Sequence, residues 1–230
     1  DLALDPASGK TTPVLQNAGS IRDLAAREDG GMCVLVGAPE NQVKAFDARG
    51  KLDQTLGKKG GRAPLGPWNP AGMREPSAVA LDAAGRAWVA ESLRTPKRFV
   101  VWDMKTGKVA DEHFGPTQYG ASGGAIHPQD PDLMVGHACE WRLEPQTGRA
   151  ACLGVFDTKT HGFATFRQGP NGKTYLFAKH SGHLGSGHVS VFERLGDGAY
   201  AHRLELLWVG RGRAPESTWW IDANGDGNRQ

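Results

Sequence analysis

Apolar residues in this chain come in short runs of four to seven positions, separated by Gly, Pro, Asp and Asn. Short apolar runs bounded by turn-forming residues are typical of consecutive antiparallel strands. Helical periodicity is nearly absent: only residues 21–27 (IRDLAAR) are worth testing for a helix, and that segment is short and ends at EDGG. The pattern therefore predicts an all-β protein.

The strands recur as a loose repeat. Residues 30–57 contain CVLVG, QVKAFD and KLDQTLG, and residues 86–115 contain AWVAE, RFVVWD and KVADEHFG. The layout PSAVALDAAGRAWVAE at 76–91 returns in part as ESTWWIDANG at 216–225. First strands begin near residues 20, 77, 122, 161 and 217, about 49 residues apart on average. Four strands in about 40 to 50 residues is the period of a β-propeller blade.

The expected fold is therefore a β-propeller of four-stranded antiparallel blades, about four of them with a partial blade at each end. A lone four-stranded meander has two apolar faces, and stacking around an axis buries both. A β-sandwich is the alternative, but nothing in a sandwich requires a repeat. The expected blades lie near residues 20–57, 77–115, 122–156 and 161–208, and the partial blades at 1–17 and 216–230.

Composition narrows the class of protein further. A chain of 230 residues is expected to form one domain or at most two, and seven Trp with eight Phe are too many for a disordered chain. The formal net charge of +2 forces no basic surface, so nucleic acid is not an expected partner. No stretch approaches the roughly 18 to 20 apolar residues of a membrane span, so no transmembrane segment is expected.

The repeat resembles a known family. PSAVALDAAGRAWVAE at 76–91, followed by RFVVWDMKTG at 98–107, resembles the units of NHL-repeat β-propellers, and so does NQVKAFDARGKLDQTLG at 41–57. The resemblance covers residues 20–115 well and is weaker over 120–230. It implies a bacterial, secreted type of propeller and a six-bladed ring, of which this chain would be a part. It implies no activity, because such rings host binders, lyases and lactone hydrolases alike.

A calcium-type loop lies near the end of the sequence. Oxygen-bearing side chains at positions 1, 3 and 5 with Gly at 6 match the front half of an EF-hand loop, which indicates a Ca²⁺ site. The acid of position 12 is not supplied, because Gln230 stands at position 9. The alternative is an ordinary β-turn, as in DAAG at 82–85. The D-x-N-x-D-G-N motif consists of Asp222, Asn224, Asp226, Gly227 and Asn228.

Histidines and one glutamate form a weaker candidate site. His180, His183 and His188 lie within nine residues, while His137 and Glu91 end the corresponding strands of the preceding blades. Strand ends of neighbouring blades converge on one rim, so Glu91, His137 and His180 are candidates for a shared funnel. Imidazole and carboxylate suit a Zn²⁺ site or an acid–base pair, and Zn²⁺ is less favoured than Ca²⁺. The favoured alternative is that Glu91 ties adjacent loops and the histidines are rim residues.

The cysteines leave the compartment open. Cys139 and Cys152 flank the turn EPQTG, so pairing about that turn places them nearly opposite each other, and a disulfide is geometrically allowed. Cys33 lies in the apolar run MCVLV and is expected to be a buried thiol. An odd count does not fix the redox compartment. The aspartate-rich loop and the propeller type favour a secreted or periplasmic protein.

These features favour a non-catalytic ligand- or protein-binding scaffold within a larger extracellular or periplasmic bacterial protein, because no tight catalytic constellation is visible. One alternative is a metal-dependent lyase or hydrolase acting in the funnel. Another is a carbohydrate-binding module in which Trp68, Trp219 and Trp220 stack on sugar rings at the rim. Adjacent strand residues face opposite sides, so at least one of Trp219 and Trp220 is expected to be in the core.

Overall fold

The computed structural model contains only strands and turns in the residues it describes, so the predicted all-β class is confirmed. Among these residues no helix is long and apolar enough to cross a membrane. The described residues are 2–4, 7–9, 11–13, 19–93, 96–115, 124–136, 138–156, 164–181, 187–209 and 216–226.

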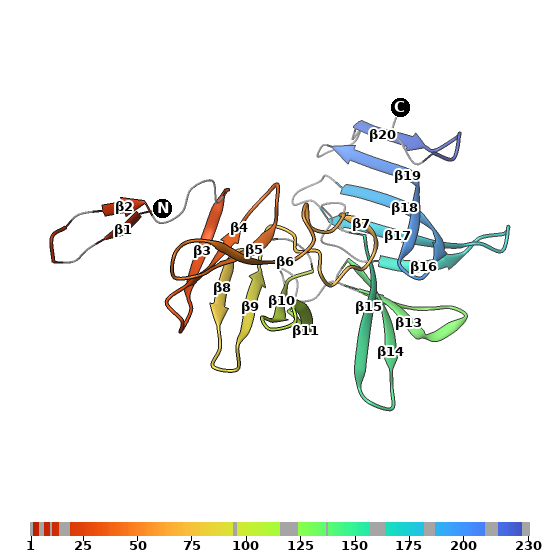
Figure 1. Cartoon of the computed structure of the whole chain (residues 1–230). Coiled ribbons are helices and arrows are strands. Elements are labelled where there is room, and N and C mark those ends of the chain that lie inside the picture. The colour runs from red at the N-terminus through yellow and green to blue at the C-terminus, as the bar shows by residue number, and fades with distance from the viewer. Residues whose placement is uncertain are drawn as a thin grey trace. The chain divides into compact units, whose positions relative to one another are not determined.

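The chain divides into two compact units, the first comprising residues 1–62 and 69–115 and the second comprising residues 63–68 and 116–230. In the first unit, two four-stranded antiparallel meanders follow each other in chain order (Figure 1). A separate hairpin pairs β1 with β2. The strands are β1 (Leu2–Leu4), β2 (Thr11–Pro13), β3 (Ile21–Ala26), β4 (Met32–Val36), β5 (Gln42–Phe46), β6 (Leu52–Leu56), β8 (Ala78–Leu81), β9 (Arg86–Glu91), β10 (Arg98–Asp103) and β11 (Lys108–Phe114).

The second unit also contains two meanders, and each has gained a fifth strand. Strand β7 pairs with β15, and β20 pairs with β19. Residues 216–221, expected to begin a separate partial blade, are thus placed at the edge of the preceding sheet. The strands are β7 (Leu65–Pro67), β12 (Ala125–His127), β13 (Asp130–Gly136), β14 (Cys139–Glu144), β15 (Arg149–Phe156), β16 (Ala164–Gln168), β17 (Thr174–Ser181), β18 (Gly187–Gly196), β19 (Ala199–Val209) and β20 (Glu216–Ile221).

The two meanders of the first unit stack face to face. Leu35 and Leu56 from the first sheet share one core with Val89, Val100 and Trp102 from the second, all at most 2% exposed. Strand β4 is buried on both faces, as its unbroken apolar run indicates, because alternate residues enter two different cores. Burial of one meander against the next is how propeller blades are stabilised.

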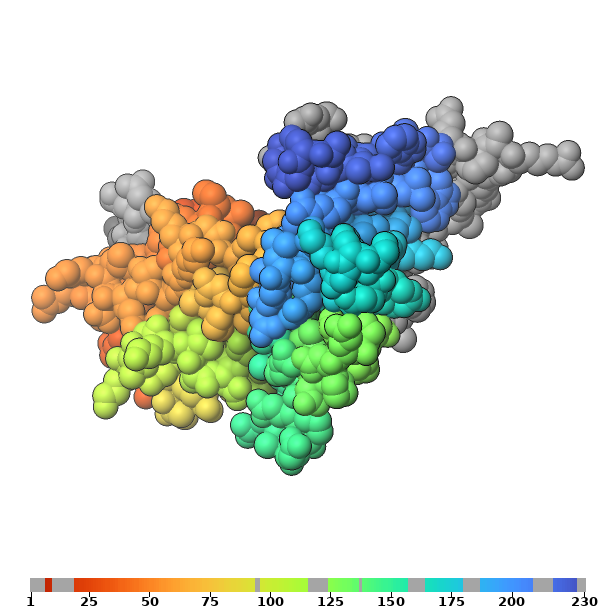
Figure 2. Space-filling model, turned by 90° about the vertical axis from the view of Figure 1, so that its right-hand side faces the viewer, coloured from red at the N-terminus to blue at the C-terminus, as the bar shows by residue number. Residues whose placement is uncertain are grey.

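The second unit repeats this arrangement. Val135 and Phe156 of one sheet pack with Phe166, Leu176 and Phe192 of the other, and the two sheets lie side by side in the space-filling view, green and blue respectively (Figure 2). Each unit is therefore a pair of stacked propeller blades, and the chain has the fold of a partial β-propeller.

Backbone approaches backbone where these two sheets of the second unit meet. A Cβ atom built on Gly154 would lie only 2.3 Å from the Cα atom of Gly198. Gly198 also has a φ of 66°, in the left-handed region that favours glycine. The two glycines thus set the spacing between β15 and the turn from β18 to β19.

Candidate functional site

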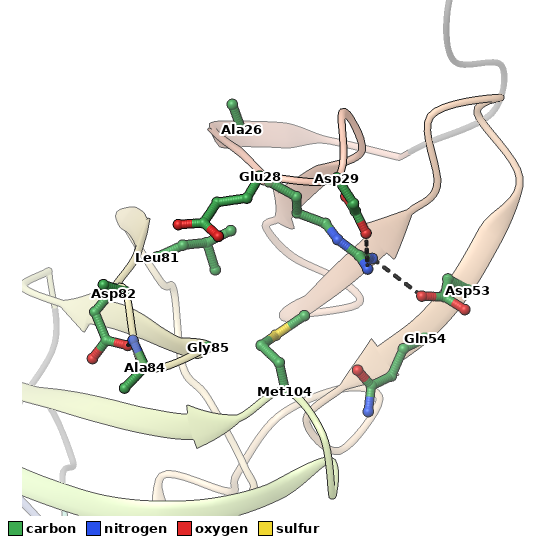
Figure 3. Close-up of a pocket in the computed structure, with 12 residues that line it drawn as sticks. Ala26, Glu28, Asp29, Asp53, Gln54, Leu81, Asp82, Ala84, Gly85 and Met104 are labelled. Atoms are coloured by element: carbon green, nitrogen blue, oxygen red, sulfur yellow. Dashed lines mark hydrogen bonds and ion pairs between the residues drawn. The ribbon is translucent and has the colours of Figure 1, made fainter.

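A cavity of about 590 Å³ opens in the first unit, where the turns between strands of its two sheets come together (Figure 3). A cavity with a few convergent polar groups is the default candidate for a binding site. Residues 26–29 comprise the end of β3 and the turn after it, residues 81–85 comprise the end of β8 and the turn to β9, and Met104 follows β10. The ionisable lining residues are Arg27, Glu28, Asp29, Asp53 and Asp82.

Arg27 balances only part of this negative charge. Its Nη2 lies 2.7 Å from Asp29 Oδ2, and its Nη1 lies 3.1 Å from Asp53 Oδ2. The backbone N–H of Gly31 and the guanidinium of Arg27 lower the pKa of Asp29. Asp82 is paired with a second guanidinium, because Arg86 Nε lies 2.7 Å from Asp82 Oδ2. Four carboxylates against these two guanidinium groups still leave the cavity wall net negative at neutral pH.

Asp82 is held by the turn in which it lies. Trp88 Nε1 donates to its Oδ2 at 2.8 Å, and the backbone N–H groups of Ala84 and Arg86 donate to its Oδ1 at 3.0 Å each. The Trp88 indole and the Arg86 N–H groups lower the pKa of Asp82 to about 2. Gly85, with a φ of 73°, allows this turn to close. Asp82 is therefore a permanent carboxylate at physiological pH.

Glu28 differs from the other acids of the cavity. Within the part of the chain that the structure describes, its carboxylate has no hydrogen bond or ion pair, and it points toward Leu81 (Figure 3). Leu81 and Met104 add apolar surface beside it. A cationic group on an apolar stem would match this lining. The lowered pKa values of Asp29 and Asp82 make these two carboxylates weak bases.

A second hollow of about 570 Å³ adjoins the first and shares Ala84, Gly85 and Met104 with it. Arg86 and Lys105 line this hollow together with Asp103. The first hollow is therefore lined by more acidic than basic side chains, and the second by more basic than acidic ones.

Glu91, a candidate for the funnel chemistry, lies at the end of β9 and is only 1% exposed. Its Oε1 accepts from Arg62 Nη1 and from the backbone N–H of Arg74, and its Oε2 accepts from Arg98 Nε. Both guanidinium groups also donate to the carbonyl of Gly72, at 3.0 Å each. This placement favours the loop-tying interpretation, because both oxygens serve a buried ion-pair network.

Glu140 on β14 is a second buried carboxylate, which sequence reasoning missed. It is 0% exposed, and its Oε1 accepts from Arg194 Nη2 at 2.7 Å while its Oε2 accepts from the Tyr200 hydroxyl. Burial raises the pKa of Tyr200, and the charge of Glu140 raises it further. The only available signal was an acid inside the apolar run ACEW.

The histidine cluster is described only in part. His137 and His183 lie outside the described residues, and the backbone of His180 in β17 lies opposite that of His188 in β18. Nε2 of His188 lies 2.7 Å from Glu205 Oε1 and 3.2 Å from the Oγ of Ser190. A serine triad needs the acid and the serine on different ring nitrogens, so this arrangement is not a triad.

The structure describes only some of the residues that were predicted to bind a metal ion. Over the residues that the structure describes, no group of three or more His, Cys, Asp or Glu side chains is placed to hold a metal ion. Asp222, Asn224 and Asp226 lie directly after β20, and Asn228 lies outside the described residues. Asp222 forms an ion pair with Arg203, whose Nη1 is 2.5 Å from Oδ2.

The register of β14 and β15 corrects the predicted cysteine geometry. Cys139 lies opposite Val155, and Cys152 lies opposite Trp141, so the two are not cross-strand partners. The turn itself sets this register, from Glu144 opposite Arg149 to Trp141 opposite Cys152, and the bulge between Glu140 and Trp141 moves the partner of Cys139 one residue further along β15. Both residues carry thiols in the structure, and Cys33 is a buried thiol as expected.

The tryptophans separate into two groups. Trp219 on β20 is 69% exposed, whereas Trp220 is half-buried and its ring centroid lies 5.0 Å from that of His202. Trp68 is also half-buried. Trp219 alone of these three presents a widely exposed aromatic face.

No protein-family model and no curated protein matches the chain. Distant structural similarities include a hydrazine synthase of Kuenenia stuttgartiensis, 15% identical with a TM-score of 0.40, covering 88% of this chain and 59% of that one. A PQQ-bound aldose sugar dehydrogenase of Streptomyces coelicolor is 12% identical with a TM-score of 0.35, covering 93% and 84%. The Dos1 propeller is 12% identical with a TM-score of 0.32, covering 93% and 63%. This chain thus spans less than two thirds of the hydrazine synthase and Dos1 chains.

Proposed function

We propose that the chain is a non-catalytic binding module of the NHL-like β-propeller class, which holds a basic side chain of a partner protein in the cavity of the first unit. The observation that carries this proposal is the lining of that cavity, where four carboxylates lie beside Leu81 and Met104 and outnumber the guanidinium groups of Arg27 and Arg86 that pair with three of them. A lysine or arginine side chain combines a charged head with an apolar stem and would match both parts.

The described chemistry elsewhere supports binding over catalysis. Two fully buried carboxylates, those of Glu91 and Glu140, are engaged by arginines, and His188 shares one nitrogen between Ser190 and Glu205. An extracellular or periplasmic parent protein remains part of the proposal, on the family resemblance. Fractionation of the producing bacterium tests that part.

The binding experiment measures the affinity of a fluorescein-labelled lysine hexapeptide by anisotropy at low salt. We expect the double variant Glu28→Gln/Asp53→Asn to bind about tenfold more weakly, which corresponds to about 1.4 kcal/mol. Loss of Asp53 also leaves Arg27 less neutralised, and this repels the cationic probe.

The double variant Asp132→Asn/Glu144→Gln is the matched control, because both acids are exposed, lie in the second unit and remove the same charge. The control is expected to bind as the wild type does. Equal weakening in the two double variants, or no binding to the wild type, would overturn the proposed site.

Carbohydrate binding is a second candidate, favoured by the 69% exposure of Trp219. An exposed indole face on an edge strand can stack on a sugar ring. A glycan array read with the wild type and with Trp219→Ala tests this, with half-buried Trp68→Ala for comparison. Binding that survives Trp219→Ala, or no binding at all, excludes a platform at Trp219.

A further inference from the structure

The aspartate-rich loop after β20 already faces a positive charge supplied by the protein. The Asp222 side chain is 0% exposed, and its Oδ2 lies 2.5 Å from Arg203 Nη1. The same nitrogen donates to the carbonyl oxygen of Gly225 at 3.0 Å. In an EF-hand-type loop, side-chain and carbonyl oxygens converge on a cation. Here a carboxylate and a carbonyl of the loop converge on a guanidinium.

The loop's other polar side chains face each other. Asn224 Nδ2 donates to Asp226 Oδ2 at 2.8 Å, and Asn224 Oδ1 accepts from the backbone N–H of Asp226 at 3.2 Å. Binding of a metal at positions 1, 3 and 5 would require the oxygens of both residues to turn toward Asp222. The described arrangement therefore does not fit a calcium ion.

Hydrogen bonds of both the side chain and the backbone of Arg203 hold this residue in place. Its Nε donates to Glu193 Oε2 on β18 at 2.9 Å, and its carbonyl oxygen accepts from the backbone N–H of Asp222 at 3.0 Å. Lys173 holds the other oxygen of Glu193 at 2.7 Å. Hydrogen bonds to Asp222 and Glu193 raise the pKa of Arg203, so it keeps its charge. The guanidinium thus joins β18, β19 and the loop.

We propose that Arg203 is the resident cation of the loop at residues 222–226: it takes the place of a metal ion, and its removal turns the loop into a divalent-cation site. The wild-type chain accordingly binds no Ca²⁺ at this loop, and the aspartate-rich motif serves to anchor the segment after β20. The inference concerns the second unit and does not depend on the proposed peptide site.

The test uses Tb³⁺ luminescence sensitised by the neighbouring tryptophans, with displacement by Ca²⁺, on the full 230-residue chain. We expect Arg203→Met to gain a saturable signal that Ca²⁺ displaces, with an affinity at least tenfold above any wild-type response. Adding Asp222→Asn to that variant should abolish the gain. Arg167→Met is the control, because Arg167 is an exposed arginine of the same unit that does not contact the loop.

Two results would overturn the inference. One is a wild-type signal displaced by Ca²⁺ and lost in Asp222→Asn, which would mean that the metal binds despite Arg203. The other is a folded Arg203→Met chain without any Ca²⁺ response, which would mean that the loop is not a cation loop. If Arg203→Met does not fold, Arg203→Gln, which keeps a donor without the charge, is read by the same two criteria.

Discussion

The two units each bury one glutamate completely, but they neutralise it differently. In the first unit Glu91 contacts two guanidinium groups, whose side chains are 2% and 0% exposed for Arg62 and Arg98. In the second unit Glu140 contacts one guanidinium, that of Arg194, whose side chain is 16% exposed, and the neutral hydroxyl of Tyr200. One carboxylate is thus compensated mainly by charge, and the other by a mixture of charge and neutral hydrogen bonds.

The difference follows from what each glutamate joins. The Glu91 network orders the segment between residues 62 and 74. Arg62 and the backbone N–H of Arg74 contact Glu91 directly. The carbonyl oxygens of Pro70 and Gly72 accept hydrogen bonds from the guanidinium groups that contact Glu91. Glu140 instead connects a strand of one sheet to the hairpin of β18 and β19 in the next, where sheet packing already orders both elements. Residues 69–74 belong to no strand, and a segment without sheet partners needs more polar contacts to stay in place.

The largest effect is expected for Glu91→Gln. The substitution removes the negative charge that balances the buried guanidinium groups of Arg62 and Arg98. Breaking a buried ion pair lowers the free energy of unfolding by about 3–5 kcal/mol. Urea unfolding would show this as a lower midpoint, and hydrogen exchange would be faster in peptides covering residues 62–74. Glu112→Gln is the matched control, because Glu112 contacts Arg98 from a side chain that is 20% exposed. A loss in Glu91→Gln no larger than in this control would contradict the loop-tying role.

A smaller effect is expected for Glu140→Gln in the second unit. The remaining partners are one partly exposed guanidinium, which water can reach, and one neutral hydroxyl. Loss of hydrogen bonds to a charged group predicts a decrease of about 1.5–3 kcal/mol in the free energy of unfolding. Denaturant unfolding of the two glutamine variants under one set of conditions gives the comparison directly. Equal losses would show that the type of compensation does not matter here.

The smallest effect at neutral pH is expected for Tyr200→Phe, about 1 kcal/mol, because Arg194 continues to balance Glu140. Its signature is the pH dependence. Burial raises the pKa of Tyr200 in the folded chain, so the unfolded chain loses this proton at lower pH. Stability is therefore fully present below the unfolded pKa and falls as the pH rises above about 10. The wild type should show this fall more steeply than Tyr200→Phe, and parallel curves would contradict it.

The sequence predicted features that depend on neighbouring residues. The runs CVLVG and RFVVWD became β4 and β10, and the D-x-x-G pattern at residue 82 became a closed turn, because alternation and turn chemistry act within a few positions. Ion-pair partners could not be predicted in this way. Arg62 and Glu91 are 29 residues apart, and only the folded arrangement shows that Arg62 is a buried arginine.

The candidate cavity was missed for a similar reason. Its acids belong to two separate turns and one strand of two sheets, and nothing in the order of residues 28, 29, 53 and 82 indicates that they share a space. The cysteine geometry and the position of β20 were also beyond local rules, because the register of one hairpin and an edge pairing decided them.

The close approach of Gly154 and Gly198 has a consequence for the whole second unit. The backbone N–H of Gly198 lies 3.5 Å from Glu140 Oε1, so this close approach of the two sheets lies directly beside the buried acid. A methyl group at either glycine would collide with the facing backbone and push the two sheets apart. Water would then reach the carboxylate of Glu140, which is 0% exposed in the structure. Two residues without side chains thus keep the solvent out of this part of the protein.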